Sequence, residues 1–106
     1  MMTLKVIAPS KDQIKEIADF LMQEKLIAEA FISGPVERLT KNSKTNGFSY
    51  EEAYTLSGLS KSLLFAVINQ EMRKKYGAKM PLLYAEPLIM MDPEHTEKTL
   101  AELRKV

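Results

Sequence analysis

The sequence predicts one α+β domain in which strands and helices follow the order βαββαβ, with a short helix at the C-terminus. Three observations support this order. Apolar residues recur every three or four positions over residues 11–23 and again over 60–76, which is typical of amphipathic helices. Short apolar runs flank both stretches, as expected for strands, and Asn46-Gly47 marks a tight turn between the second and third runs. A chain of 106 residues has the length of a single domain, so residues 1–106 are expected to form one folded unit.

The first strand is the apolar run Leu4–Ala8, which Pro9 ends because proline has no backbone N–H for the ladder. Ser10 and Gln13 then form the Ser-x-x-Gln capping box of a helix start. This helix places its apolar side chains on one face: Ile14, Ile17, Ala18, Leu21 and Met22. The second strand is expected over Leu26–Ile32.

The next stretch predicts a bend and a hairpin. Ser33-Gly34-Pro35 interrupts the extended pattern, which favours a β-bulge or a change of strand direction. The segment from Arg38 to Ser49 is polar and lysine-containing, and it is interpreted as a hairpin tip or a mobile loop. The third strand is expected between Phe48 and Leu59, with its alternation interrupted around Glu51-Glu52.

The second helix is expected over Ser60–Tyr76, and Gly77 is a natural C′ residue at which a helix stops. Its apolar stripe consists of Leu63, Leu64, Val67, Ile68 and Met72. Arg73, Lys74 and Lys75 occupy its last turn, where cations suit the carbonyl end of a helix whether or not they bind a ligand.

The fourth strand is expected over Met80–Met91, where Pro81 and Pro87 indicate an edge position or a bend. Asp92-Pro93 then supplies the N-cap and first residue of a helix over Glu94–Lys105, which is expected to pack Leu100 and Leu103.

This order of elements is the ferredoxin-like split βαβ arrangement, an antiparallel sheet of four strands with two backing helices and, here, a short C-terminal helix. Helices would cover one face of the sheet only. The runs Leu82–Ala85 and Leu88–Met91 are apolar on both sides, so an exposed second face is not expected. Self-association is the simplest way to cover it.

Composition excludes several classes of function. The chain has 15 Lys and Arg against 14 Asp and Glu, so no strong field favours a nucleic-acid or membrane partner. It has no cysteine, which excludes disulfides, thiolate catalysis and cysteine-ligated metal sites. No run approaches the roughly 20 apolar residues of a membrane span, and the first apolar run is too short for a signal-peptide core. A cytoplasmic protein is therefore expected.

Three motifs resemble the CutA family, trimeric ferredoxin-like proteins named for divalent-cation tolerance. They are Pro9-Ser10 at the helix entry, Glu24-Lys25-Leu26-Ile27-Ala28 running into the second strand, and the segment Met80–Ile89 with prolines six residues apart. The resemblance covers most of the chain. It implies a homotrimer that binds a small ligand or a divalent ion at clefts between subunits, with a role in metal-ion tolerance or response.

The chain departs from the family pattern at positions that matter for metals. Glu29 stands where the family usually has cysteine, Tyr76-Gly77-Ala78 replaces His-Pro-Tyr, and Leu82 replaces an acidic residue. We therefore expect weak or no copper binding. The remaining candidate metal ligands are the single histidine, His95, and the thioethers of Met90 and Met91. The favoured interpretation is that His95 is a solvated residue in the first turn of the last helix and that the methionines are core filler.

The predicted fold is also similar to that of PII-type signalling proteins, which bind nucleotides between subunits and carry a mobile loop between strands two and three. This resemblance implies an alternative function, a regulator that binds nucleotide or another anion and contacts a protein partner through residues 38–49. The candidate ligand-binding residues are basic and lie near Gly77 and in the polar segment: Arg73, Lys74, Lys75, Lys79, Lys41 and Lys44.

An enzyme is the third alternative, since carboxylates could perform acid–base chemistry. The candidates are Glu51, Glu52, Glu71 and Glu86, but no nucleophile motif or glycine-rich phosphate loop accompanies them. The sequence therefore predicts a non-enzymatic protein with no catalytic residues.

Overall fold

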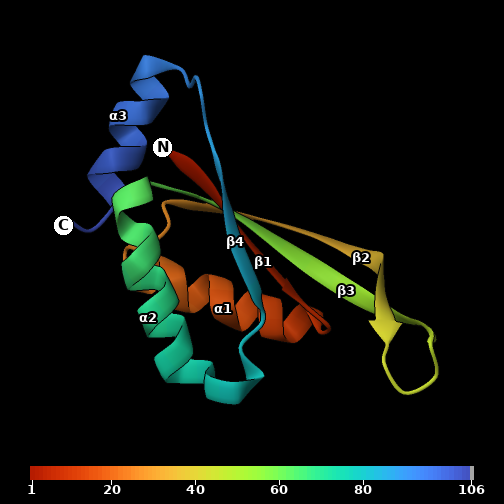
Figure 1. The fold of residues 1–106 in the computed structure, drawn as a ribbon. Helices are drawn as coiled ribbons and strands as arrows, with labels where there is room; N and C mark the ends of the chain where they lie inside the picture. Colours follow the sequence, from red (N-terminus) through yellow and green to blue (C-terminus); the bar gives the residue numbers. More distant parts are fainter. Residues whose placement is uncertain (106) are drawn as a thin grey trace.

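The computed structural model, which describes residues 1–105, confirms the predicted α+β class (Figure 1). The elements are β1 (Met2–Ala8), α1 (Lys11–Gln23), β2 (Glu29–Asn42), β3 (Gly47–Ser60), α2 (Phe65–Tyr76), β4 (Leu82–Pro87) and α3 (Pro93–Glu102). Short 3₁₀ turns cover Ser62–Leu64 and Gly77–Lys79. All strand pairs are antiparallel, and the strand order β2-β3-β1-β4 is that of the ferredoxin-like sheet. No helix within residues 1–105 combines the length and the apolar character needed to cross a membrane.

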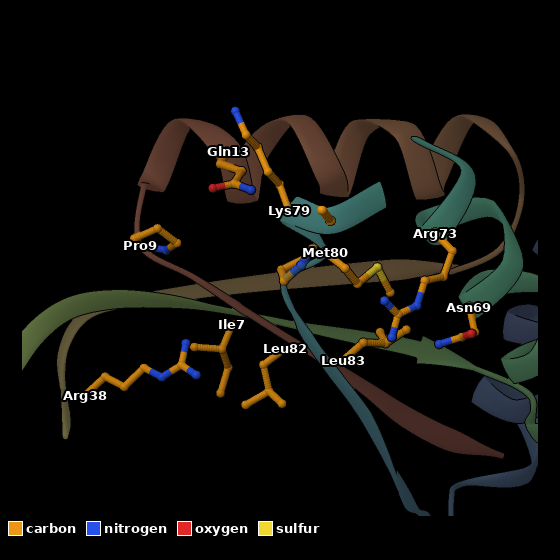
Figure 2. Close-up of a pocket in the computed structure, with 12 residues that line it drawn as sticks. Ile7, Pro9, Gln13, Arg38, Asn69, Arg73, Lys79, Met80, Leu82 and Leu83 are labelled. Atoms are coloured by element: carbon orange, nitrogen blue, oxygen red, sulfur yellow. The ribbon is translucent and has the colours of Figure 1, made fainter. Parts of the chain in front are cut away.

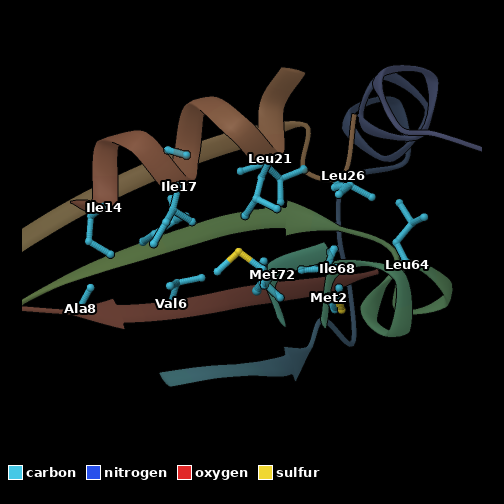
Figure 3. Close-up of a cluster of buried hydrophobic side chains, with 14 of the residues drawn as sticks. Met2, Val6, Ala8, Ile14, Ile17, Leu21, Leu26, Leu64, Ile68 and Met72 are labelled. Carbon is cyan, nitrogen blue, oxygen red and sulfur yellow. The ribbon is translucent and has the colours of Figure 1, made fainter. Parts of the chain in front are cut away.

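The hydrophobic core lies between the sheet and helices α1 and α2. Met2, Leu4, Val6 and Ala8 alternate along β1 and are all buried. Figure 3 shows β1 side chains facing residues of α1 and α2, and the cluster comprises Ile14, Ile17 and Leu21 from α1, Leu56 from β3, and Ile68 and Met72 from α2. Each fully buried side chain of this kind contributes about 1.5–3 kcal/mol relative to an exposed one.

The start of α1 is confirmed in detail. The Ser10 hydroxyl accepts a hydrogen bond from the Gln13 backbone N–H at 3.3 Å, so it satisfies one of the donors that a helix start leaves free. The predicted apolar stripe is buried except for Met22, which is exposed in the last turn. Met22 is therefore not part of the core, and the predicted packing of Met22 is wrong.

The predicted second helix begins too early. Ser60 is the last residue of β3, paired with Met2, and α2 starts only at Phe65. The buried Ser60 hydroxyl donates a hydrogen bond to the Leu26 carbonyl at 2.6 Å. A serine that resembles a helix cap in sequence is instead a structural link between β3 and the turn after α1. The predicted end of the helix at Gly77 is confirmed, because Gly77 has φ +53° and its N–H donates to the Arg73 carbonyl.

The β2–β3 hairpin is longer than the sequence predicts. Pairing runs continuously to Asn42↔Gly47, with a register shift only between Ser33 and Val36, which confirms the bulge. The prediction of a polar loop from Arg38 to Ser49 is wrong in extent, since only residues 43–46 lie outside the strands. Cross-strand pairing makes the polar segment into a ladder, and β3 is uninterrupted at Glu51-Glu52.

Glycine is required at the bend of β2. Gly34 has φ +134°, and a Cβ there would lie 2.8 Å from Tyr54 Cδ1. The chain therefore turns at Gly34 close against β3, and the hairpin projects beyond the helices (Figure 1).

The fourth strand is shorter than predicted, ending at Pro87 rather than Met91. The Leu88 N–H bonds to the Met1 carbonyl at 3.1 Å, and the chain then leaves the sheet. Asp92 caps α3 by accepting from the His95 N–H at 3.1 Å. Within α3 and its end, Leu103 is buried as predicted but Leu100 is exposed, so that part of the packing prediction is wrong.

The face of the sheet opposite the core is open in the single chain. In register, Lys5 lies beside Tyr84 on β4 and Ser57 on β3, while Ile7 lies beside Leu82. Residues directly opposite one another point to the same side, so these side chains share the open face with Phe31, the partner of Ser57. Phe31, Leu82 and Tyr84 are 57%, 45% and 39% exposed. The predicted apolar second face exists, but its centre is mixed with polar residues.

Candidate functional site

A cavity of about 670 Å³ lies where β1 ends and β4 begins, bordered by the start of α1 and the end of α2 (Figure 2). Its polar lining consists of Gln13, Arg38, Asn69, Arg73 and Lys79. Its apolar lining includes Ile7, Met80, Leu82 and Leu83. The cavity therefore combines an apolar floor with three cationic side chains.

Two of these cations, Arg73 and Lys79, come from the end of α2 and the 3₁₀ turn that follows it. Arg73 is in the last turn of α2, which stops at Gly77. The 3₁₀ turn Gly77–Lys79, closed by the Met80 N–H to the Gly77 carbonyl at 3.2 Å, then brings Lys79 to the cavity before β4 starts.

The other polar groups come from distant parts of the chain. Asn69 lies one helical turn before Arg73, and Gln13 is in the first turn of α1. Arg38 reaches the cavity from β2, where it is paired in register with Glu51, and its side chain is half-buried. The site therefore depends on the packing of β2, α1 and α2 around the ends of β1 and β4.

The cavity is electropositive. No carboxylate is among its lining residues. Within residues 1–105, the ion pair closer than 4.0 Å is Arg104 with Glu24, at 3.1 Å, and the His95 Nδ1 lies 3.6 Å from Asp92 Oδ2. Arg38, Arg73 and Lys79 thus have no carboxylate within 4.0 Å in the described part of the chain, so an anion entering the cavity would meet three cationic side chains.

Comparison with known proteins identifies the fold. No family model and no curated protein matches the sequence. Among solved structures, the divalent cation tolerance protein from Thermus thermophilus superposes with a TM-score of 0.86 at 15% identity, covering 98% of this chain and 100% of that one. CutA1 from Oryza sativa gives 0.87 at 17%, covering 99% and 94%. The periplasmic divalent cation tolerance protein CutA from Archaeoglobus fulgidus gives 0.86 at 19%, covering 98% and 100%.

This chain has the CutA fold. The resemblance drawn from the sequence motifs is thereby confirmed at the level of the fold. The word periplasmic describes the Archaeoglobus protein, and the cytoplasmic location of this CutA-like chain stays a prediction.

The structure brings together two of the six basic residues predicted to bind ligand. Arg73 and Lys79 line the cavity, whereas Lys74 is exposed on α2 and is not part of the lining. The Lys75 Nζ lies 4.7 Å from the centre of the Phe20 ring, a cation–π contact between α2 and α1. Lys41 and Lys44 lie at the hairpin tip, away from the lining of this cavity (Figure 1).

Sequence reasoning missed Arg38, Gln13 and Asn69. Arg38 enters the prediction only as the first residue of the polar segment, and its position depends on the β2–β3 register and the bulge. Gln13 is interpreted only as a capping residue. No local signal marks Asn69, although its spacing of four residues from Arg73 puts both on one helix face.

The candidate metal ligands are only partly together. His95 and Met91 line a second cavity of about 370 Å³ with Glu29 and Lys98, while Met90 is 90% exposed and is not in that lining. Residues 1–105 contain no group of three or more His, Cys, Asp or Glu side chains placed to hold a metal ion.

The candidate acid–base carboxylates are also dispersed. Glu51 and Glu52 line a shallow surface cavity on the hairpin with Glu37, whereas Glu71 lies on α2 and Glu86 on β4. None of the four lines the cationic cavity.

Proposed function

We propose that this chain is a CutA-like, non-enzymatic, cytoplasmic protein that forms homotrimers and binds a small ligand or ion in clefts between subunits, with a role in metal-ion tolerance or response. The observation that carries the proposal is the open face of the sheet. Its aromatic and aliphatic side chains Phe31, Leu82 and Tyr84 are exposed in one chain, although they lie on a continuous antiparallel sheet.

Burial of this face by other copies of the chain is energetically favourable. Apolar surface removed from water contributes about 25 cal/mol per Å². The projecting hairpin extends the available surface with the exposed side chains of Leu39, Phe48 and Tyr50. A stable interface buries about 1,600 Å² in total, and a sheet face together with a long hairpin is a surface of the kind that can supply it.

The sheet edges favour a ring. Strands β2 and β4 are the two edges of the sheet, so each has a row of backbone groups without a strand partner within residues 1–105. A contact between the β2 edge of one copy and the β4 edge of the next is head-to-tail, and such contacts form a closed ring when the rotation between copies closes and an open filament when it does not. The CutA-like fold supports three subunits as the size of the ring.

The cationic cavity is suited to be a cleft at such an interface. Ile7 and Leu82 line it and belong to the open face, and Arg38 reaches it from the hairpin. A second copy on this face would border the cavity and shield it from water. The ligand site is therefore proposed to lie at the edge of the subunit interface, with Ile7 and Leu82 contributing to both.

Light scattering tests the assembly directly. Wild-type protein at micromolar concentration should give three times the mass of one chain, and Phe31→Glu should shift it toward monomer by placing a charge on the covered surface. Leu63→Glu is the matched control, because Leu63 is 72% exposed in the turn before α2 and is not on the open face. A monomer mass for the wild type would refute the proposal.

A second candidate function is a PII-like regulator that binds nucleotide or another anion and contacts a protein partner through residues 38–49. The three unpaired cations of the cavity favour it. A thermal-shift screen with nucleotides and divalent ions separates the two candidates, since a ligand that binds only the folded state raises the midpoint of unfolding.

A further inference from the structure

We infer that the cavity lined by Arg38, Arg73 and Lys79 is a binding site for a small organic phosphate that carries at least two negative charges. This inference rests on the proposed function and deepens it, because it names the chemical class of the ligand for that cleft. Arg73 and Lys79 are close in the sequence, whereas Arg38 joins them from β2.

The charge of the cavity sets the minimum charge of the ligand. Two guanidinium groups and one ammonium face a lining without a carboxylate. A single carboxylate would leave two positive charges uncompensated, whereas a phosphate dianion or a diphosphate would balance most of them. Guanidinium groups also bind phosphate oxygens in a bidentate way, and a phosphate presents more acceptor oxygens than a carboxylate does.

The arrangement of the cavity indicates an organic body between charged contacts. In Figure 2, Arg38 and Arg73 lie on opposite sides of the cavity, with Ile7 and Leu82 between them and Lys79 above. The floor between the two arginines is therefore apolar. A ligand that fills the space must place uncharged atoms against this floor while its charged groups reach the cationic side chains.

The volume agrees with such a ligand. About 670 Å³ is within the range of roughly 300–1,000 Å³ found for small-molecule sites and exceeds the size of inorganic phosphate. The side-chain amides of Gln13 and Asn69 also line the cavity, and each can both donate and accept hydrogen bonds. They can orient hydroxyl or ring-nitrogen groups of the ligand body.

Calorimetric titration of the full chain tests the ligand class. The probes are ADP and fructose 1,6-bisphosphate as organic phosphates, inorganic phosphate as the bare anion, and adipate as a dicarboxylate. At least one organic phosphate should bind at least tenfold more tightly than both inorganic phosphate and adipate. Failure of both organic phosphates to bind at millimolar concentration, or equal binding by inorganic phosphate or adipate, would overturn the inference.

Two variants and one control assign the site. Arg38→Ala and Arg73→Ala should each weaken binding of the organic phosphate by about tenfold or more, the effect of losing a charged hydrogen bond. Lys74→Ala removes a cation next to Arg73 that does not line the cavity, so it should have little effect. Unchanged affinity in both arginine variants would overturn the site.

Light scattering of the same samples separates this inference from the proposed assembly. If the wild type is a trimer but binds no organic phosphate, the ligand inference fails and the assembly stands. If the wild type is a monomer and the arginine variants still lose binding, the assembly fails and the cationic site stands.

Discussion

The two faces of the sheet differ in burial: helices cover one face, and the other is exposed to solvent in the single chain. On β1, Leu4 and Val6 point toward the helices and are fully buried, while Lys5, between them in sequence, points to the open face. The covered face is completed by α1 and α2, which the same chain supplies. The open face has comparable regularity, but nothing within residues 1–105 covers it, and it is the surface proposed for self-association.

Polar groups differ between the faces in the same way. Ser60, on the covered side of β3, is fully buried and its hydroxyl donates to the Leu26 carbonyl at 2.6 Å. Ser57, three residues earlier and on the open side, accepts a hydrogen bond from the half-buried Lys5 Nζ at 2.8 Å. A polar group of the covered face has a single obligatory partner, whereas one of the open face remains within reach of solvent.

The largest expected difference in the free energy of unfolding is between two leucine-to-alanine variants, one on each face of the sheet. Leu56→Ala, on the covered face, should lower the free energy of unfolding by about 2–5 kcal/mol, because it removes buried surface and leaves a cavity. Leu82→Ala, on the open face, should cost less at low protein concentration, and its effect on the unfolding midpoint should grow as assembly sets in. Denaturant titrations at several protein concentrations measure both variants.

The contrast fails if Leu82→Ala lowers stability as much as Leu56→Ala at a concentration where light scattering shows a monomer. Leu82 would then belong to the folding core rather than to an interface. Conversely, a concentration-dependent midpoint for Leu82→Ala alone would sharpen the distinction between the two faces.

A smaller effect is expected from two serines of β3. Ser60→Ala should cost about 1–3 kcal/mol, because it leaves the buried Leu26 carbonyl without its hydrogen-bond donor. Ser57→Ala should change stability by less than about 0.5 kcal/mol, since the Lys5 ammonium can turn to water. Thermal or denaturant unfolding of both variants provides the measurement, and equal costs would contradict the contrast.

The fold was predictable where local signals and tertiary contacts agree. The Ser10 cap, the buried stripe of α1 and the stop at Gly77 follow from capping chemistry and the helical repeat. Ser60 was not predictable in the same way, because a serine before an apolar stretch resembles a helix cap and its real partner, Leu26, is 34 residues away in the sequence.

The candidate site was only half predictable for the same reason. Arg73 and Lys79 lie within one short segment around a glycine, so their clustering is visible in the sequence. Arg38 joins them only because β2 pairs with β3 through a bulge. The polar composition of residues 38–49 resembles a loop, and strand pairing, a non-local contact, overrides it.

The smallest expected effect concerns two tyrosines at alkaline pH. Burial raises the pKa of the Tyr76 phenol above its ordinary value of 10.0, and the nearby negative charge of Glu16 raises this pKa further. The folded state therefore holds the phenol proton more tightly than the unfolded state does. The associated stability is fully present below about pH 10 and is lost as pH rises through the folded pKa.

Tyr76→Phe should accordingly make the loss of stability above about pH 10 less steep, because phenylalanine has no proton to lose. Tyr50→Phe is the matched control at a protein concentration where light scattering shows a monomer, since the Tyr50 ring is exposed on the hairpin of the single chain. The unfolding midpoint measured from pH 8 to 11 gives both slopes. If Tyr76→Phe keeps the wild-type dependence of the unfolding midpoint on pH, the surroundings of the Tyr76 phenol do not control stability at alkaline pH. The difference between covered and exposed groups would then not extend to the helices.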